Sequence, residues 1–198
     1  MPLTLGGAAR HNIANAAAAV LAAAALGLPV QAITQTLLHF GQHPQDNPGR
    51  LERWAHRGAT VLVDYAHNPD GLTELLTVAR ALKPQRLGLL LGQAGNRDDA
   101  AIKQLAHTAA AFAPDLVVIK ELPGMLRGRP LGEVPALLRQ ALSAAVHTLD
   151  EADEEAAALT LLAWAQPGDV VVLPVHTRAV RERLTTRLKA GWSTAAPA

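Results

Sequence analysis

Beyond residue 59 the chain alternates between short apolar runs and longer stretches in which apolar residues recur at helical spacing. The apolar runs predict β-strands at Thr60–Val63, Arg86–Leu91, Leu116–Lys120 and Asp169–Val175. The stretches with helical spacing predict α-helices at Asp70–Leu82, Asp98–Phe112, Glu133–Ala145, Ala152–Trp164 and Arg178–Lys189. Strands and helices that alternate over these lengths predict an α/β domain with a mainly parallel sheet and helices on both faces.

The first 45 residues follow a different pattern. An alanine-rich run at 16–28 superficially resembles a signal peptide, but it is too short for a membrane span, which needs roughly 20 apolar residues. Because alanine favours helix and the apolar spacing continues beyond Pro29, we predict two packed helices, Asn12–Leu26 and Val30–His39. Residues 41–49 are almost entirely polar or turn-forming, which predicts a hinge between one domain at 1–45 and another at 46–198.

A polar cluster follows the predicted strand at 60–63. Gly58 separates an apolar run containing Leu51 and Trp54 from the run at 60–63, which predicts a short strand pair. The second strand of this pair ends in four polar residues, Asp64, Tyr65, His67 and Asn68. Open α/β sheets place ligand contacts at such strand ends. The alternative is that Asn68 merely caps the next helix, with Pro69 in its first turn.

Further polar residues follow the other predicted strands. A glycine-containing turn at 92–99 offers backbone N–H groups to an anion, although Asp98 capping the following helix is the interpretation that we favour. Lys120 and Glu121 end the next strand, and the loop at 122–130 carries Arg127 and Arg129. These arginines either lie on a solvated loop or form a pair that grips a carboxylate. His176, after the last strand, fits a hydrogen-bonded polar residue better than a catalytic one.

Composition excludes several classes of function. Of the 198 residues, 49% are hydrophobic and 18% charged, which is typical of a globular protein, and the formal net charge of +1 gives no case for nucleic acid or an anionic membrane. The absence of cysteine excludes disulfides, thiolate metal sites and cysteine nucleophiles within this chain, and it favours a cytoplasmic location. The chain has neither a G-x-x-x-x-G-K-[ST] phosphate loop nor closely spaced metal ligands, so no metal site is predicted.

Four motifs in order carry a family resemblance. They are Gly-Ala-Ala-Arg-His-Asn-Ile-Ala-Asn at 7–15, Arg-Leu-Glu at 50–52, Asp-Tyr-Ala-His-Asn-Pro at 64–69 and Gly-Asn-Arg-Asp at 95–98. This series resembles the C-terminal part of the Mur ligase superfamily, whose members are ATP-dependent amide-forming ligases. The longer motifs Asn-Pro-Gly-Arg-Leu, Ile-Lys-Glu at 119–121 and Leu-Arg-Gly-Arg at 126–129 are most similar to the cyanophycin synthetase branch.

The resemblance implies a fold and a set of roles. Residues 1–45 would be the last helices of a central ATPase domain, and residues 46–198 a C-terminal Rossmann-like domain. The family's nucleotide contacts match Asn12, Asn15, Arg50, Asp64, His67 and Asn68. Among these, Arg50 would reach the ATP phosphates, Asp64 would hold the ribose, and Arg50 with His67 would be catalytic. Candidates for recognition of an amino acid or peptide substrate are Arg97, Asp98, Lys120, Glu121, Arg127 and Arg129.

These roles suit the chemistry of amide ligation. Arginine neutralises charge on a phosphoryl group during transfer, and a carboxylate suits the paired hydroxyls of a ribose. A hinge between two domains would let closure assemble the nucleotide site and exclude water. Arg50, directly after the predicted hinge, would be carried into the site by that closure.

The chain also departs from the family pattern. The phosphate loop and the Mg²⁺ ligands are expected in missing N-terminal ligase domains, in cis or in trans, so no activity is expected from this chain alone. Leu122-Pro123-Gly124 replaces the family's acidic residues. Val-His-Thr-Arg at 175–178, which includes His176, stands where peptidoglycan ligases carry Lys-Gly-His-Glu, and this argues against a peptidoglycan ligase. Two hypotheses stay open, part of an ATP-dependent ligase or a non-catalytic binding or assembly module, and a homo-oligomer is compatible with either.

Overall fold

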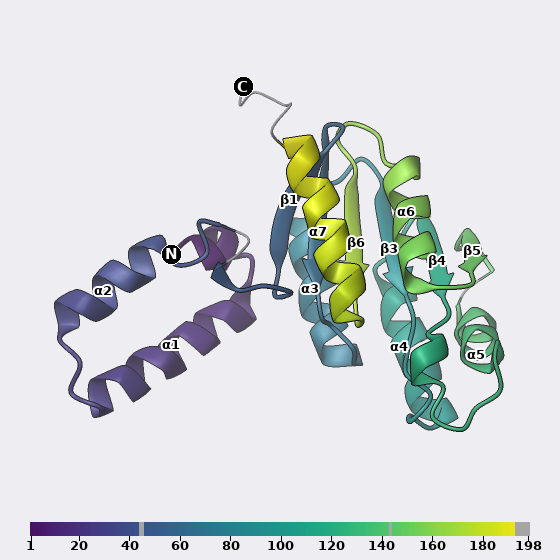
Figure 1. The fold of residues 1–198 in the computed structure, drawn as a ribbon, viewed down its shortest axis with the longest axis horizontal. Coiled ribbons are helices and arrows are strands. Elements are labelled where there is room, and N and C mark those ends of the chain that lie inside the picture. Colours follow the sequence, from purple (N-terminus) through teal and green to yellow (C-terminus); the bar gives the residue numbers. More distant parts are fainter. Residues whose placement is uncertain (44–45, 143, 193–198) are drawn as a thin grey trace.

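The computed structural model describes residues 1–43, 46–142 and 144–192. A six-stranded sheet forms the centre of the larger part (Figure 1). Its strand order is β1 (Glu52–His56), β2 (Ala59–Asp64), β6 (Val170–Pro174), β3 (Leu87–Leu91), β4 (Leu116–Lys120) and β5 (Thr148–Glu151). The β1–β2 hairpin is antiparallel and all other pairs are parallel, so the carboxyl ends of β2, β6, β3 and β4 meet at one edge of the sheet.

Helices cover both faces of this sheet, as Figure 1 shows with α6 and α7 in front of it and α3 and α4 behind. The helices on one face are α3 (Pro69–Ala81), α4 (Asp99–Ala111) and α5 (Glu133–Ala141), and those on the other are α6 (Glu154–Trp164) and α7 (Arg178–Trp192). Because β3, β4 and β6 are covered on both faces, all of their residues are buried.

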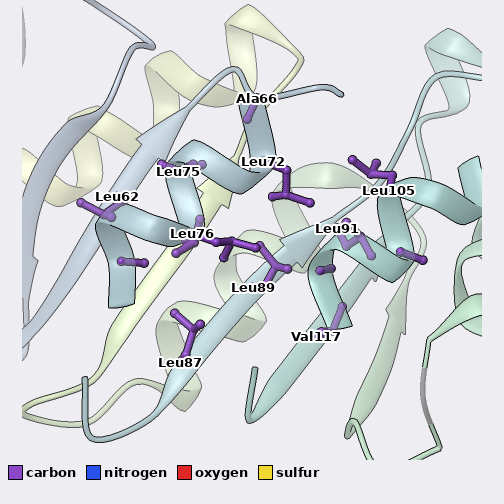
Figure 2. Close-up of a cluster of buried hydrophobic side chains, with 14 of the residues drawn as sticks. Leu62, Ala66, Leu72, Leu75, Leu76, Leu87, Leu89, Leu91, Leu105 and Val117 are labelled. Carbon is purple, nitrogen blue, oxygen red and sulfur yellow. The ribbon is translucent and has the colours of Figure 1, made fainter. Parts of the chain in front are cut away.

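Alternating strand residues divide between two apolar cores. Leu62, Leu89 and Val117 face α3 and α4, where they meet leucines such as Leu76 and Leu105 (Figure 2). The adjacent residues in the strands, such as Val61, Leu90 and Val118, instead face α6 and α7. This alternation fixes the register of each strand, since a slip of one residue would turn every side chain to the opposite core.

The N-terminal segment stands apart from the sheet (Figure 1). After the 3₁₀ helix η1 (Pro2–Gly7), α1 (Arg10–Ala25) and α2 (Val30–His39) form an antiparallel hairpin. Asn12 is the one buried residue of α1, and α2 has none among its described residues. His11 Nδ1 lies 3.2 Å from Glu74 Oε2 on α3, which connects the start of α1 to the sheet domain.

The predicted α/β class, the mainly parallel sheet, the helices on both faces and the two preceding helices are confirmed. Two details differ from the prediction. The helix predicted at Glu133–Ala145 ends at Ala141, because Leu142 turns extended at φ −72° and ψ 144°. The edge strand β5 was not predicted, since its four residues include only one apolar side chain, Leu149.

A buried carboxylate, Asp169, lies at the amino end of β6. Asp169 accepts hydrogen bonds from Arg86 Nε at 3.1 Å and from the Gln166 N–H at 2.8 Å, and the Arg86 guanidinium lies 4.0 Å from the centre of the Trp164 ring. Burial alone would raise the pKa of Asp169, but these hydrogen bonds and the Arg86 charge hold it below its usual value.

We therefore predict that this carboxylate stabilises the fold above its unfolded-state pKa. That contribution begins to fall when the pH drops below the unfolded-state pKa of about 4. It is lost once the pH has also passed the lower folded-state pKa. Urea unfolding between pH 7 and pH 3 should show a steeper loss of stability in the wild type than in Asp169→Asn, which is less stable at pH 7. Parallel pH profiles of the two proteins would contradict this role.

Candidate functional site

A cavity of about 460 Å³ lies where the start of α1 meets the end of β2 and the start of α3. Its walls come from α1, the linker before β1, the end of β2 and the β2–α3 loop. Six of its lining residues are the predicted nucleotide contacts, Asn12, Asn15, Arg50, Asp64, His67 and Asn68. The fold therefore brings together residues from three separate stretches of the chain, while their contact with a nucleotide stays a prediction.

Asp64 organises one wall of this cavity. Its Oδ2 accepts a hydrogen bond from the Leu51 N–H at 2.6 Å, and its Oδ1 accepts one from the Ala66 N–H at 2.7 Å. Burial raises the pKa of Asp64, although the two amides and Arg50 act in the opposite direction. Each carboxylate oxygen can accept a second hydrogen bond, so the carboxylate that fixes the linker can also accept from a ligand hydroxyl.

Arg50 is presented by a turn with unusual backbone geometry. Gly49 and Leu51, on either side of it, have φ values of 73° and 51°. The left-handed conformation is costly for leucine, and the Asp64 hydrogen bond and the burial of the Leu51 side chain hold it there. Arg50 itself is exposed, and it also borders a second cavity of about 510 Å³ between η1 and β1.

The remaining cavity residues differ in how firmly they are held. Asn12 is buried and donates from Nδ2 to the Leu3 carbonyl at 3.1 Å, whereas Asn15 is exposed at the cavity. His67 Nδ1 lies 3.2 Å from the Tyr65 carbonyl. Sequence reasoning missed Gln93, which donates from Nε2 to the His67 carbonyl at 3.0 Å and so fixes this loop. A lone glutamine after a strand gave no signal of that role.

Asn68 does cap α3, as the alternative prediction proposed, because its Oδ1 accepts from the Gly71 N–H at 2.8 Å. Asn68→Ala should therefore lower the free energy of unfolding by about 1 kcal/mol. Asn68→Asp keeps a capping oxygen and should retain that stability, but it adds a carboxylate to those of Asp64, Asp70 and Glu74 at the cavity and should weaken ADP binding. Urea unfolding and ADP titration of both variants measure the two effects, and unchanged ADP affinity in Asn68→Asp would reduce Asn68 to a cap.

A buried ion pair lies where the ends of β4 and β6 meet, and it commits Lys120 to the interior. Lys120 is 1% exposed, and its ammonium donates to Glu154 Oε1 at 2.5 Å and to the Pro174 carbonyl. Glu154 also accepts from the His176 N–H at 2.7 Å and the Thr177 N–H at 2.8 Å. Burial favours the neutral acid, but Lys120 and these amides hold the pKa of Glu154 below its usual value. Lys120 therefore stabilises the interior and does not reach the surface, so a direct substrate contact is not supported.

His176 is a hydrogen-bonded polar residue, as its position indicated. Its Nε2 donates to the Ala66 carbonyl at 3.1 Å, in the loop between Asp64 and His67. Burial lowers the pKa of His176 to about 3, and the nearby Lys120 charge acts in the same direction. The imidazole is therefore neutral at pH 7, with its proton on the nitrogen that faces the carbonyl.

Two loops that carry predicted substrate residues pack against each other. The Gly95 N–H donates to the Met125 carbonyl at 2.9 Å, and a side chain at Gly95 would lie 2.0 Å from the Leu126 carbonyl oxygen. Arg129 joins the loops, donating to the Gly95 and Arg97 carbonyls and pairing with Asp99 and Glu133. Arg129 is therefore committed to holding the loops in place.

Other members of the predicted substrate set are also used internally. Glu121 accepts from the Leu122 and Gly132 N–H groups, and Asp98 caps α4 by accepting from the Ala101 N–H at 2.7 Å. Arg97 and Arg127 are exposed, and within the described part of the chain their guanidinium groups make no hydrogen bond or ion pair. Of the predicted substrate residues, these two arginines keep their charges available for a ligand.

Comparison with known proteins identifies a family. A family model described as Mur ligase, glutamate ligase domain, matches residues 49–174. A UDP-N-acetylmuramoyl-L-alanyl-D-glutamate–2,6-diaminopimelate ligase of Gloeobacter violaceus is 36% identical over 176 residues, which cover 83% of this chain and 32% of that protein. A cyanophycin synthetase of Crocosphaera subtropica is 36% identical over 156 residues, covering 79% of this chain and 17% of that protein.

Solved structures agree in fold. A UDP-N-acetylmuramate–alanine ligase of Thermotoga maritima superimposes with a TM-score of 0.59 at 18% identity, over 91% of this chain and 38% of that one. Escherichia coli FolC, solved with bound ADP, superimposes with a TM-score of 0.55 at 20% identity, over 73% of this chain and 32% of that one.

Among the described residues, no helix has the length and apolar character needed to cross a membrane.

The chain spans about a third of the length of the diaminopimelate ligases that it matches, and a fifth or less of the cyanophycin synthetases. The match and the fold together confirm the resemblance to the C-terminal portion of the Mur ligase superfamily. This chain belongs to the Mur ligase family, through its glutamate ligase domain.

Proposed function

We propose that this chain is the nucleotide-closing and amine-recognising part of an ATP-dependent ligase that joins a carboxylate to an amine and releases ADP. The observation that carries this proposal is the cavity of about 460 Å³ in which six predicted nucleotide contacts converge from α1, the linker, β2 and the β2–α3 loop. Convergence of amide, carboxylate and guanidinium groups in one cavity suits a ligand with a base, hydroxyls and phosphates.

The residues present fit such a ligand. ATP, when bound, supplies the phosphoryl group that activates the substrate carboxylate. Asn12 and Asn15 line the cavity, where the exposed Asn15 offers its amide to the base, and Asp64 keeps acceptor capacity for ribose hydroxyls. Arg50 is exposed at the cavity with a permanent positive charge, and it would neutralise the charge of a phosphoryl group during transfer.

We propose the domain division at residues 45 and 46 on the same basis. The α1–α2 hairpin stands apart from the sheet and exposes Ile13, Leu21, Leu26, Leu28, Val30 and Leu38. Such a face suits burial against the remainder of an ATPase domain, in cis or in trans. That domain would supply the phosphate-binding loop and the Mg²⁺ ligands, since the described residues hold no cluster of three metal-binding side chains.

The amine substrate would be recognised at the two packed loops. Arg97 and Arg127 offer free guanidinium groups suited to the carboxylate of an amino acid or peptide.

Overall identity does not choose between branches of the family, because diaminopimelate ligases match at 33–36% and cyanophycin synthetases at 33–37%. We propose a cyanophycin-synthetase-like enzyme. The motifs around Arg50, Lys120 and Arg127 support this proposal, as does the sequence Val-His-Thr-Arg around His176, where peptidoglycan ligases carry Lys-Gly-His-Glu.

The test is ADP release by the ligase that contains this chain, measured with L-aspartate, L-arginine, L-glutamate or diaminopimelate as the amine. We expect ADP release to require an amine, with aspartate or arginine most active. Arg127→Gln should raise the KM for that amine more than it lowers kcat, because it removes a binding charge. ADP binding without any amine-dependent turnover would contradict the proposal and favour a non-catalytic binding module.

A further inference from the structure

One aromatic residue, Tyr65, lies beside the candidate site, next to two of the residues that line its cavity. The Arg50 guanidinium carbon lies 5.3 Å from the centre of the Tyr65 ring. The His67 ring lies 5.2 Å from the same ring at an interplanar angle of 51°. His176 meets it edge-on, at 5.7 Å and 76°. Tyr65 therefore contacts both residues predicted to be catalytic.

Buried hydrogen bonds anchor the loop that carries Tyr65. His176 donates from Nε2 to the carbonyl of Ala66, the residue after Tyr65, and its backbone N–H donates to Glu154. Glu154 is in turn held by the buried ammonium of Lys120. A chain of buried hydrogen bonds thus connects the ends of β4 and β6 to the loop that carries Tyr65.

Within the described residues, the Arg50 side chain makes no hydrogen bond or ion pair, and besides Tyr65 only the charge of Asp64 attracts it. Its backbone is fixed by the turn at 49–51, but the guanidinium is exposed and is free to adopt many rotamers. An aromatic face within about 6 Å attracts a guanidinium electrostatically and reduces that freedom. The site thus pairs an exposed cation with a half-buried ring whose loop is anchored by hydrogen bonds.

We propose that Tyr65 is a positioning residue, whose ring, held edge-on by His176, fixes the Arg50 guanidinium at the nucleotide cavity. The consequence for catalysis rests on the proposed ligase function. The placement itself does not, because it is a property of the protein without ligand.

The placement is tested by NMR of the 198-residue chain, through the side-chain proton shifts of Arg50. Ring currents from Tyr65 should move the Arg50 Hδ and Hε resonances upfield of those of Arg97, which is exposed. Tyr65→Leu should remove this displacement, and Tyr65→Phe, which keeps the ring face, should restore it. Should Tyr65→Leu fail to fold, Tyr65→Met removes the same ring. An Arg50 shift that survives loss of the ring in a folded variant would overturn the proposal.

The effect of Tyr65 on nucleotide binding is tested by a double-mutant cycle that measures the ADP affinity of the ligase that contains this chain. Tyr65→Leu should weaken ADP binding about two- to fivefold, the range expected for one partly exposed cation–π contact. The same change in an Arg50→Ala background should have no further effect. Equal losses in both backgrounds would show that Tyr65 acts independently of Arg50 and overturn its positioning role. Absence of ADP binding in the wild type would contradict the proposed function, while the proton shifts would still decide the placement.

Discussion

Arg50→Ala is expected to reduce the turnover of the proposed ligase about 100-fold or more, while its affinity for ATP falls by less than about tenfold. The reason is that Arg50 is exposed and lines the cavity, and under the proposed function its charge acts on the phosphates of the nucleotide. A charge that acts on a phosphoryl group during transfer contributes more to the transition state than to binding. Single-turnover kinetics and ATP titration of the same preparations separate the two effects.

Arg53 is the matched control for this experiment. It is an exposed arginine three residues further along, on β1, and it lines the second cavity but not the one with the predicted nucleotide contacts. Arg53→Ala removes the same charge at nearly the same place in the chain and should leave turnover within about twofold of the wild type. Parallel losses of turnover and affinity in Arg50→Ala, or equal losses in both variants, would contradict a role in charge neutralisation.

Lys120→Met should be the most damaging substitution for the fold, lowering the free energy of unfolding by about 3–5 kcal/mol. It leaves the carboxylate of Glu154, which is 3% exposed, without its counter-ion in the interior. Removal of Lys120 should also loosen the β6–α7 loop, because Glu154 holds the His176 and Thr177 amides. Urea unfolding at pH 7 measures the loss of stability.

Two controls distinguish a buried pair from general disruption. Adding Glu154→Gln to Lys120→Met removes the unpaired charge and should recover part of the lost stability. Arg183→Ala breaks an exposed ion pair with Glu155 and should have a much smaller effect. A loss in Lys120→Met no larger than that in Arg183→Ala would contradict the importance of the buried pair.

The regular elements could be predicted because their cause is local. β3, β4 and β6 are continuous apolar runs, and such runs are visible in the sequence. β5 could not be predicted, because an edge strand paired on one side needs no apolar run, and Thr148–Glu151 has none. The capping roles of Asn68 and Asp98 were predictable for the same local reason.

The roles of several site residues could not be predicted, because they depend on contacts between residues that are far apart in the sequence. Lys120 looked like a substrate residue because it ends a strand beside Glu121, yet its partner Glu154 lies on another element and only the fold brings them together. The hydrogen bond from the Leu51 N–H to Asp64 and the contact of Tyr65 with Arg50 likewise leave no trace in spacing or composition. The set that converges at the cavity was identified through its resemblance to a family rather than through periodicity.

The most direct test of the central claim is a titration of the isotope-labelled chain with ADP, followed by backbone amide NMR, which detects even weak binding. The claim is that α1 and the end of β2 form the two sides of one nucleotide site. It predicts that shifts concentrate at residues 11–15, 50–51 and 64–68, and that they move together with one dissociation constant. Shifts confined to the basic helix α7, or shifts at residues 11–15 and 64–68 with different dissociation constants, would contradict it.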